Sequence, residues 1–486
     1  MIKAVRDPNF EAKHSAFDYQ QSAVTKLLPL PFGAVLHEQG LGKTKIALDL
    51  TLHWISSGAL DSVIVCTKKH LIENWRDEII EHTFVHPRLF TQDKAANFRA
   101  VNSPARIYLT HYEVFASSPS RFRLFLKTRR VGIILDEAQK IKNPDSKVTK
   151  ALFGLREGFE KRVIMTGTPI PNRPYDIWAP IYFLDGGAAL GRSFEEFRSR
   201  VDLDASVRHD PRRREEFEAD LERIWAAVEP FSARETKQSS GLELPDKIYR
   251  PIEVDLEPRQ RELYDKVRNE LRAVIVEGGL PKMDEADVTL KRLLRLVQIA
   301  SNPATVDESY RAVPGKYPVV ENEIHAMLDR REKVIVWTSF IKSANWLARE
   351  LQPLGVAVHH GEMSHEERSQ AIRKFKTDVD CRILVATPAS AKEGLTLTVA
   401  NNAIFFDRSF SLDDYLQAQD RIHRISQRRE CNIVNVVAKD TIDEWIDSLV
   451  NAKGLAAALA QGDIAREKFA AEMTYGFDEI LKKVLR

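Results

Sequence analysis

A glycine-rich segment near the start of the chain has the composition of a phosphate-binding loop. It reads HEQGLGKT (37–44), follows a short apolar run and opens a stretch of helical periodicity. Gly40 and Gly42 allow the backbone to curl so that its N–H groups face phosphate oxygens, and the next helix directs its N-terminal dipole at the same anion. Lys43 can reach the β- and γ-phosphates, and Thr44 can hold Mg²⁺ through its hydroxyl.

This loop departs from the strict pattern at one position, because His37 stands where glycine is expected. A chance match remains the alternative for the motif taken alone. With its strand–loop–helix setting, the segment predicts an ATP site with consecutive contacts. The predicted contacts are Gln39, Gly40, Leu41, Gly42, Lys43, Thr44 and Lys45.

A pair of carboxylates ends a second apolar run, IILDEAQKIKN (133–143). Asp136 would bind Mg²⁺ directly or through water, and Glu137 would orient and deprotonate an attacking water. A charged strand end is common in any α/β protein, so the pair alone decides little. The order of the motifs favours a catalytic pair over an ordinary charged strand end, since a phosphate loop precedes a buried strand with terminal Asp-Glu. The sequence therefore predicts ATP hydrolysis with Mg²⁺ as cofactor.

Two arginines near the end of the chain, Arg421 and Arg424 in QAQDRIHRISQ (417–427), are predicted to share one face of a helix. Such a pair is usually an exposed basic face. In a chain with a phosphate loop, planar guanidinium groups can also meet the charge that spreads over the γ-phosphoryl group. Supplied from a second domain, they would make hydrolysis depend on domain closure.

Two more residues are weaker candidates for the nucleotide site. The Gln20 amide, just before the first predicted strand, could read the adenine edge, and the alternative is an ordinary surface glutamine. Gly394 would let the backbone approach nucleotide or phosphodiester, and the alternative is a plain strand-to-helix turn.

Short apolar runs rich in Val and Ile alternate with amphipathic stretches in both halves of the chain. The predicted strands lie at 33–37, 62–67, 106–111, 131–137 and 162–168, and again at 333–340, 356–361, 382–388, 402–407 and 431–438. Runs this continuous are typical of parallel strands buried on both faces. The sequence thus predicts an α/β fold with two parallel-sheet domains in tandem.

The charged stretch from about 180 to 300 has a helical pattern and is predicted to be a helical insertion between the sheets, and the tail from Thr441 is predicted to be helical as well. Within the insertion, the run 212–214 of three arginines could touch phosphate. A solvated helix start paired with Glu215 and Glu216 is the favoured alternative.

Together these motifs resemble the Swi/Snf-type ATPases of helicase superfamily two, from about Phe17 to about Trp445 and in the family's order. Beside the segments already quoted, VIVCTKKHLIENWRDEI (63–79), MTGTPIPNRPYDIW (165–178) and LKRLLRLVQIASNPA (290–304) carry the resemblance. It favours Gln20 over Gln21 as the adenine-reading residue. It also identifies Gln139, where many relatives have His, as the group that senses the nucleotide state.

The resemblance implies two RecA-like domains, at 1–180 and 306–440, with helical protrusions and a linker at 181–305 and a helical brace at 441–486. It implies an ATP cleft between the domains and double-stranded DNA across both, along which family members translocate without separating the strands. The implied DNA contacts are Lys68, Thr110, Lys142, Thr338 and Thr387.

Composition limits the partners. The net charge is only +2, so any basic surface for DNA must be local. The three cysteines, Cys66, Cys381 and Cys431, lack metal-ligand spacing, which argues against zinc fingers and fits a reducing compartment. No signal peptide and no run long enough to span a bilayer are visible. We expect a cytoplasmic protein of bacterial or viral origin, or a nuclear one in a eukaryote.

No reader domain is visible beside the motor segments, so we expect a bare, monomeric motor that displaces or remodels bound protein and is targeted by a protein partner. Two alternatives stay open at this point: a strand-separating DNA or RNA helicase, and an ATP-gated DNA clamp without turnover. Glu137 argues against the clamp, which could dispense with a catalytic base.

Overall fold

The computed structural model describes residues 9–102, 104–203, 207, 210–241, 244–278, 286–390 and 395–473. They form two compact units, each described here by itself. The first takes its described residues from Met1–Leu242 and Ala456–Ala471, and the second from Glu243–Leu455 and Glu472–Arg486. The chain therefore leaves the first unit and returns to it near its C-terminal end.

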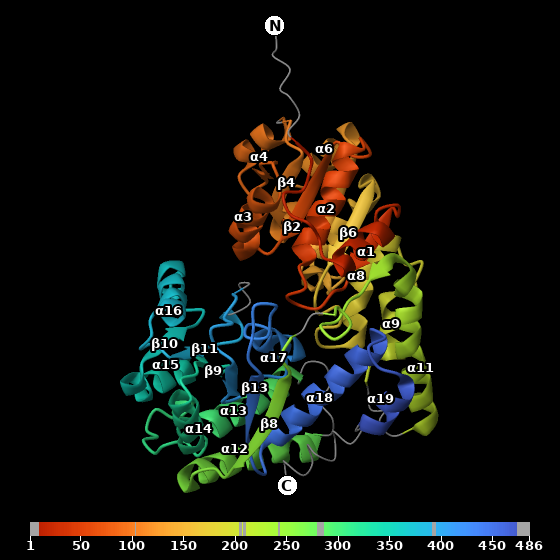
Figure 1. Cartoon of the computed structure of the whole chain (residues 1–486). Helices are drawn as coiled ribbons and strands as arrows, with labels where there is room; N and C mark the ends of the chain where they lie inside the picture. Colours follow the sequence, from red (N-terminus) through yellow and green to blue (C-terminus); the bar gives the residue numbers. More distant parts are fainter. Residues whose placement is uncertain are drawn as a thin grey trace. The chain divides into compact units, whose positions relative to one another are not determined.

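A seven-stranded sheet, parallel at every pairing, forms the centre of the first unit (Figure 1). Its spatial order is β3-β4-β2-β5-β6-β1-β7. The strands are β1 (Phe32–Val35), β2 (Ser62–Thr67), β3 (Arg88–Leu89), β4 (Ile107–His111), β5 (Val131–Asp136), β6 (Lys161–Met165) and β7 (Ser232–Ala233). Every residue of β2 is buried, as expected for a strand covered on both faces.

Helices connect and cover these strands. They include α1 (Asp18–Leu27), α2 (Lys43–Ser56), α3 (Ile72–His82), α4 (Lys94–Val101), α5 (Tyr112–Ser117), α6 (Pro119–Thr128), α7 (Lys147–Phe153), α8 (Trp178–Asp185), α9 (Phe194–Val201), α11 (Pro211–Val228) and α19 (Arg466–Glu472). Apolar side chains of α1, α2 and α3 form one buried core cluster with β1, β2 and β4. This packing fixes the start of α2 against the sheet.

The second unit holds a six-stranded parallel sheet of order β10-β11-β9-β12-β13-β8. Its strands are β8 (Lys247–Val254), β9 (Val334–Trp337), β10 (Val356–His359), β11 (Ile383–Ala386), β12 (Asn402–Phe405) and β13 (Cys431–Ala438). The α-helices between β7 and α19 are α12 (Pro258–Gly278), α13 (Ala286–Ser301), α14 (Tyr317–Asp329), α15 (Ile341–Glu350), α16 (His365–Thr377), α17 (Leu412–Gln419) and α18 (Ile442–Ala460). The predicted fold class, two parallel α/β sheets in tandem, is confirmed.

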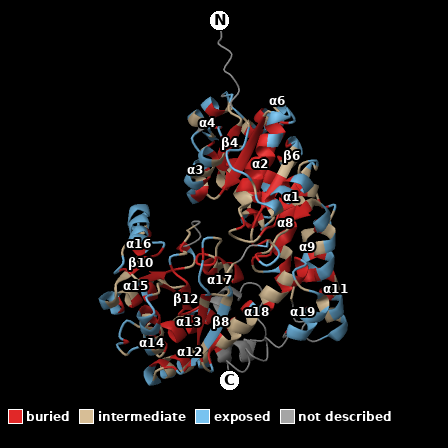
Figure 2. Ribbon diagram, viewed as in Figure 1, coloured by how far each residue is buried: buried red, intermediate tan, exposed pale blue. Residues whose placement is uncertain are grey.

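The predicted helical insertion also contains two strands, β7 and β8, and each of them extends a sheet. β7 has only two residues, and most of β8 is exposed at a sheet edge (Figure 2), so neither strand carries a continuous apolar run. Pro251 within β8 also fits an edge strand, where a missing N–H costs little.

The helical parts of the insertion are as predicted, and the arginine run opens α11. Arg213 lies 3.3 Å from Glu216, which supports the solvated helix start. In the ranges that the structure describes, no helix is long and apolar enough to cross a membrane. The boundaries at 180, 305 and 440 stay a prediction.

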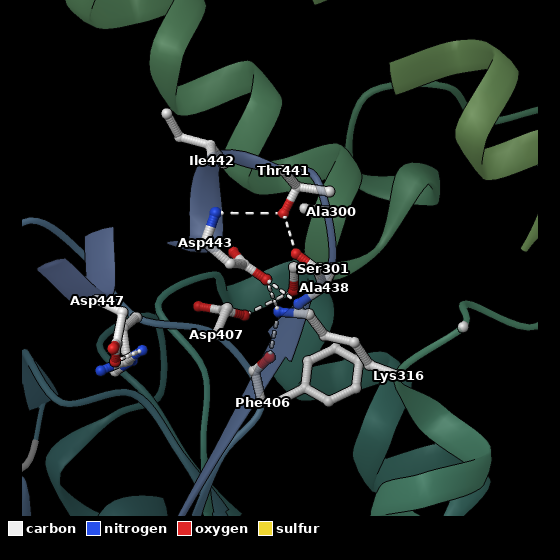
Figure 3. Close-up of polar contacts among 12 residues, drawn as sticks. Ala300, Ser301, Lys316, Phe406, Asp407, Ala438, Thr441, Ile442, Asp443 and Asp447 are labelled. Atoms are coloured by element: carbon white, nitrogen blue, oxygen red, sulfur yellow. Dashed lines mark hydrogen bonds and ion pairs between the residues drawn. The ribbon is translucent and has the colours of Figure 1, made fainter. Parts of the chain in front are cut away.

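A fully buried lysine ties the start of α18 to the sheet of the second unit (Figure 3). Lys316 Nζ lies 2.5 Å from Asp443 Oδ2 and donates to the Phe406 carbonyl at 2.9 Å. The same Asp443 oxygen accepts a hydrogen bond from the Ala438 amide at the end of β13. Phe406 follows β12, and Ala438 is the last residue of β13. The Lys316–Asp443 pair therefore joins the ends of these two strands to the first turn of α18.

Asp407 and Arg408, the two residues after Phe406, hold the same loop through further contacts. Asp407 accepts hydrogen bonds from the hydroxyl groups of Ser301, at 2.6 Å, and Thr338, at 2.5 Å. Arg408 lies 2.6 Å from Asp447 on α18. This loop leads into α17, so these contacts fix the position of the chain that precedes the candidate arginines.

We predict that Lys316→Met lowers the free energy of unfolding by about 3–5 kcal/mol, because it leaves the Asp443 carboxylate buried and unpaired. Adding Asp443→Leu should recover much of that loss, since the uncompensated charge is then gone. Urea denaturation of the full chain measures both, with Lys439→Met, from an exposed pair, as control. An unchanged urea midpoint for Lys316→Met would contradict the prediction.

Candidate active site

The carboxyl ends of three neighbouring parallel strands meet at one edge of the first sheet. β6 lies between β5 and β1, and Met165 is in register with both Asp136 and Val35. The phosphate loop follows β1, the carboxylate pair ends β5, and Thr166 follows β6. Parallel pairing therefore brings three segments that are far apart in sequence into one place, where open α/β sheets bind their ligands.

The phosphate loop has the backbone that its glycines were expected to provide. Gly40 has φ +87° and Gly42 has φ +68°, both in the left-handed region, and Gly42 caps the N-terminus of α2. A Cβ on Gly42 would lie 2.3 Å from Gln20 Nε2, so a side chain there would displace the Gln20 amide. Lys43 Nζ donates to the carbonyls of His37 and Glu38, at 3.0 and 3.1 Å. Phosphate oxygens would be stronger acceptors for this ammonium.

Gln20 is buried against the loop, whereas Gln21 is exposed. Gln20 Nε2 donates to the Leu41 carbonyl at 3.2 Å, and its Oε1 accepts from the Phe17 amide. The Lys45 ammonium lies 2.5 Å from Asp49, and the Lys45 amide donates to the Gly42 carbonyl. The contact of Lys45 with nucleotide stays a prediction.

His37, the departure from the strict pattern, is buried beside β7. Its Nδ1 lies 3.1 Å from the Ala233 carbonyl. Burial, together with the charges of Lys43 and Arg234, lowers the pKa of His37 to about 4. The imidazole is therefore neutral at neutral pH and adds no charge to the phosphate site.

Asp136 is held by two donors from other elements. Its Oδ2 accepts from Trp75 Nε1 at 2.8 Å and from Thr67 Oγ1 at 2.9 Å. Burial and the neighbouring Glu137 charge raise the pKa of Asp136. A divalent cation would offset that cost, and Asp136 with Thr44 at the start of α2 offers the oxygen ligands that Mg²⁺ prefers.

Glu137 stands in a strained backbone conformation, with φ +53°. Such strain in a residue other than glycine costs on the order of 1–3 kcal/mol and persists where the surroundings enforce it. Here Gln139 Nε2 donates to one carboxylate oxygen, Gln39 Nε2 lies 3.4 Å from the other, and Lys68 Nζ lies 3.5 Å away. The carboxylate is thus oriented from three sides, as a catalytic base must be.

Gln139 also connects this carboxylate to the segment after β6. Thr166 Oγ1 donates to Gln139 Oε1 at 2.8 Å, while the other end of the same amide donates to Glu137. Thr166 is therefore linked to the Glu137 carboxylate through the Gln139 amide. The amide suits this role because it has both an acceptor and a donor.

The two arginines lie in the second unit, and one prediction about them is wrong. α17 ends at Gln419, so Arg421 and Arg424 follow the helix in a series of turns. Side chains take the carbonyls that a helix would use: Arg424 Nε donates to Asp420 and Gln427 Nε2 to Ile422. Nη1 of Arg424 donates to Thr396 Oγ1 at 2.6 Å. Gly394, just before, lies outside the described residues.

The predicted DNA contacts occupy two kinds of position. Thr110, Thr338 and Thr387 are buried at the carboxyl ends of β4, β9 and β11, and each hydroxyl donates within the protein. Lys68 pairs with Glu137, and Lys142 lies 3.1 Å from Asp176. Their contact with DNA stays a prediction.

Sequence reasoning did not assign functional roles to Thr67, Trp75 and Thr166. Trp75 lies 61 positions from Asp136 in the sequence. The register of β2 beside β5 is what places Thr67 next to the carboxylate. Spacing along the chain carries no signal for such contacts.

Comparison with known families agrees with this arrangement. The model of the SNF2-related domain matches residues 30–305, which is more than half of the chain. This chain belongs to the SNF2-related family. The model of the helicase conserved C-terminal domain matches residues 315–426 of the same SNF2-related chain.

Individual relatives of this SNF2-related chain come from bacteria, archaea and animals. A Mycoplasma genitalium protein named an uncharacterized ATP-dependent helicase is 26% identical over 452 residues, covering 90% of this chain and 41% of its own length. The human SWI/SNF-related matrix-associated actin-dependent regulator of chromatin subfamily A member 1 is 25% identical over 499 residues, covering 94% and 46%. This chain thus spans less than half of either protein.

One solved structure, the Sulfolobus solfataricus SWI2/SNF2 ATPase core in complex with double-stranded DNA, is 27% identical to this chain. The match covers 97% of each chain, with a TM-score of 0.43.

We predict that Gln139→Ala lowers ATP turnover about tenfold, the equivalent of one lost hydrogen bond, with little change in ATP affinity. Thr166→Val should have a similar effect, and the double variant should be no slower than either single one, because both break the same link. Steady-state phosphate release and ATP titration measure these quantities. Multiplicative losses in the double variant would show that the two residues act separately.

Proposed function

We propose that this chain hydrolyses ATP and uses the energy to translocate along double-stranded DNA. The observation that carries the proposal is the meeting of the phosphate loop, Asp136 and Glu137 at the edge formed by β1, β6 and β5. Family membership supports it, since the relatives' names include ATP-dependent helicases.

In this proposal, Lys43 and the amides of the loop bind the β- and γ-phosphates, and Asp136 with Thr44 holds Mg²⁺. The metal, when bound, neutralises charge on the phosphates. Glu137 accepts a proton from the water that attacks the γ-phosphorus, while Gln139 and Gln39 keep its carboxylate oriented.

Arg421 and Arg424 complete the site in the transition state. The Arg424 guanidinium is held by Thr396 and the Asp420 carbonyl, and Arg421 is buried with Nη1 3.4 Å from the Leu395 carbonyl. Groups positioned in this way lose little freedom when they meet developing negative charge. Because the arginines belong to the second unit, turnover would depend on domain closure.

A link between track and chemistry supports DNA dependence. Lys68, a predicted DNA contact, lies 3.5 Å from the Glu137 carboxylate. Drawing the Lys68 ammonium toward a DNA phosphate would change the charge beside Glu137. DNA bound at Lys68, Thr110, Lys142, Thr338 and Thr387 would then favour the state of Glu137 that accepts a proton from water.

The archaeal relative whose structure holds double-stranded DNA supports duplex as the track. The proposal includes displacement of bound protein by a monomer. It also includes targeting by a protein partner, because phosphate contacts carry no sequence information. Strand separation would require a wedge and a single-strand path.

For the chemistry, we predict that Arg424→Ala lowers turnover by about 10³–10⁵ while ATP affinity changes far less, because the arginine serves the transition state. Arg424→Lys should not restore turnover, since an ammonium lacks the planar fork. Lys43→Ala should lose both binding and turnover. Near-normal turnover in Arg424→Ala and Arg421→Ala would show that neither arginine belongs to the site.

For the track, we predict that duplex DNA stimulates phosphate release at least as well as single-stranded DNA and that affinity for DNA falls with salt. The chain should displace a triplex-forming third strand in the presence of ATP and leave a forked duplex paired. Phosphate release that ignores every nucleic acid would refute the proposal, and unwinding of the fork would favour a strand-separating helicase.

A further inference from the structure

The chain around α3 carries a buried tryptophan to the carboxylate that ends β5. Leu71, Trp75 and Ile79 recur at helical spacing, lie on one face and belong to the core cluster of the first unit. Trp75 is only 2% exposed, and its indole Nε1 donates to Asp136 Oδ2 at 2.8 Å. The packing of α3 therefore fixes the position of this donor.

The hydrogen bonds that described residues donate to the Asp136 carboxylate both end on the same oxygen. Thr67 Oγ1, at the end of β2, donates to Oδ2 at 2.9 Å, beside the indole. A carboxylate oxygen has about two lone-pair sites, so Trp75 and Thr67 together occupy Oδ2. Tyr112, which is fully buried, donates from its hydroxyl to the Asp136 backbone carbonyl at 2.7 Å. The residue is thus fixed at its backbone and at Oδ2, and Oδ1 remains for a cation.

One short segment of the chain contacts both members of the carboxylate pair. Thr67 at its start and Trp75 at its end donate to Asp136. Between them, Lys68 Nζ lies 3.5 Å from Glu137. A single 3₁₀ turn joins Lys68 directly to α3. The three side chains that contact the pair therefore come from one continuous, ordered piece of backbone.

Two other buried tryptophans of the first unit have neutral acceptors. Trp54, also 2% exposed and in the same core cluster, donates to the Leu28 carbonyl at 3.4 Å. Trp178 donates to the Gly191 carbonyl at 3.0 Å. A carbonyl is enough for an indole that only fills a core. The carboxylate that Trp75 contacts accepts a stronger, charge-assisted bond, and this bond orients the carboxylate as well as the ring.

We propose that Trp75 is a positioning residue for the metal site. Its indole N–H, together with the Thr67 hydroxyl, holds the Asp136 carboxylate so that Oδ1 alone is left for the divalent cation. The inference rests on the proposed role of Asp136 in holding Mg²⁺. Hydrogen-bond partners of ligating side chains typically contribute about 10–100-fold to metal affinity. Trp75 therefore acts on the binding of the metal, whereas the phosphate loop binds the nucleotide with or without it.

The first test compares the affinity of the full chain for a non-hydrolysable ATP analogue with and without Mn²⁺, which serves as the probe for Mg²⁺. Trp75→Phe keeps an aromatic ring and removes the N–H. It should lower the gain in affinity that Mn²⁺ provides about tenfold and leave the affinity for the metal-free analogue within about twofold. Thr67→Val removes the other donor and should lower the same gain, and it decides the test if Trp75→Phe fails to fold.

Trp54→Phe is the matched control, because it makes the same substitution at a tryptophan of equal burial in the same core. Both of its affinities should equal those of the unchanged chain. An equal loss of both affinities in Trp75→Phe would indicate a role in packing alone and would overturn the inference.

Asp136→Asn separates this inference from the proposed function. It should remove most of the gain that Mn²⁺ provides, since it removes the ligand's charge. A full gain in Asp136→Asn would refute the role of Asp136 in metal binding. Loss of the gain in Asp136→Asn beside a full gain in Trp75→Phe would overturn only the role of Trp75.

The second test observes the indole directly. Nitrogen–proton correlation spectra show a signal for each indole N–H, and the two Phe variants assign those of Trp75 and Trp54. Adding Mg²⁺ to the chain saturated with the analogue should move the Trp75 signal, because the cation draws charge from the carboxylate that accepts its hydrogen bond. The Trp54 signal should stay in place. A Trp75 signal that moves no more than that of Trp54, in a chain whose metal gain depends on Asp136, would contradict the inference.

Discussion

The parallel pairing of β6 with β5 on one side and β1 on the other is the constraint on which the site depends. Because the strands point the same way, their carboxyl ends share an edge, and Met165 is in register with both Asp136 and Val35. This pairing alone brings together the phosphate loop, the carboxylates and Thr166. A reversed β6 would carry Thr166 to the opposite edge and break its link to Gln139.

Charge placed at this edge is costly, and the structure shows how it is held. Burial and Glu137 raise the pKa of Asp136, which Trp75 and Thr67 offset only in part by hydrogen bonds. Glu137 keeps a left-handed backbone that its neighbours enforce. In the proposed function, a bound divalent cation would offset the cost of the buried Asp136 charge.

The sequence predicted the buried strands and the motifs that follow them, because continuous apolar runs and local spacing are properties of contiguous residues. It failed where structure depends on partners elsewhere. β8 was missed because an edge strand needs no apolar run, and the arginines were placed on a helix because helical spacing does not reveal that Gln427 and Arg424 take its carbonyls. The chain Thr166–Gln139–Glu137 depends on strand register, which one sequence alone does not give.

The central claim is that three segments, distant in sequence, form one ATP site at a single sheet edge. Hydrogen exchange of backbone amides, measured with and without a non-hydrolysable ATP analogue and Mg²⁺, tests it most directly. The account predicts slower exchange at residues 39–45, at the end of β5 around Asp136 and at 166–168, all at the same analogue concentration. Protection of the phosphate loop with no change at the other two segments would contradict it.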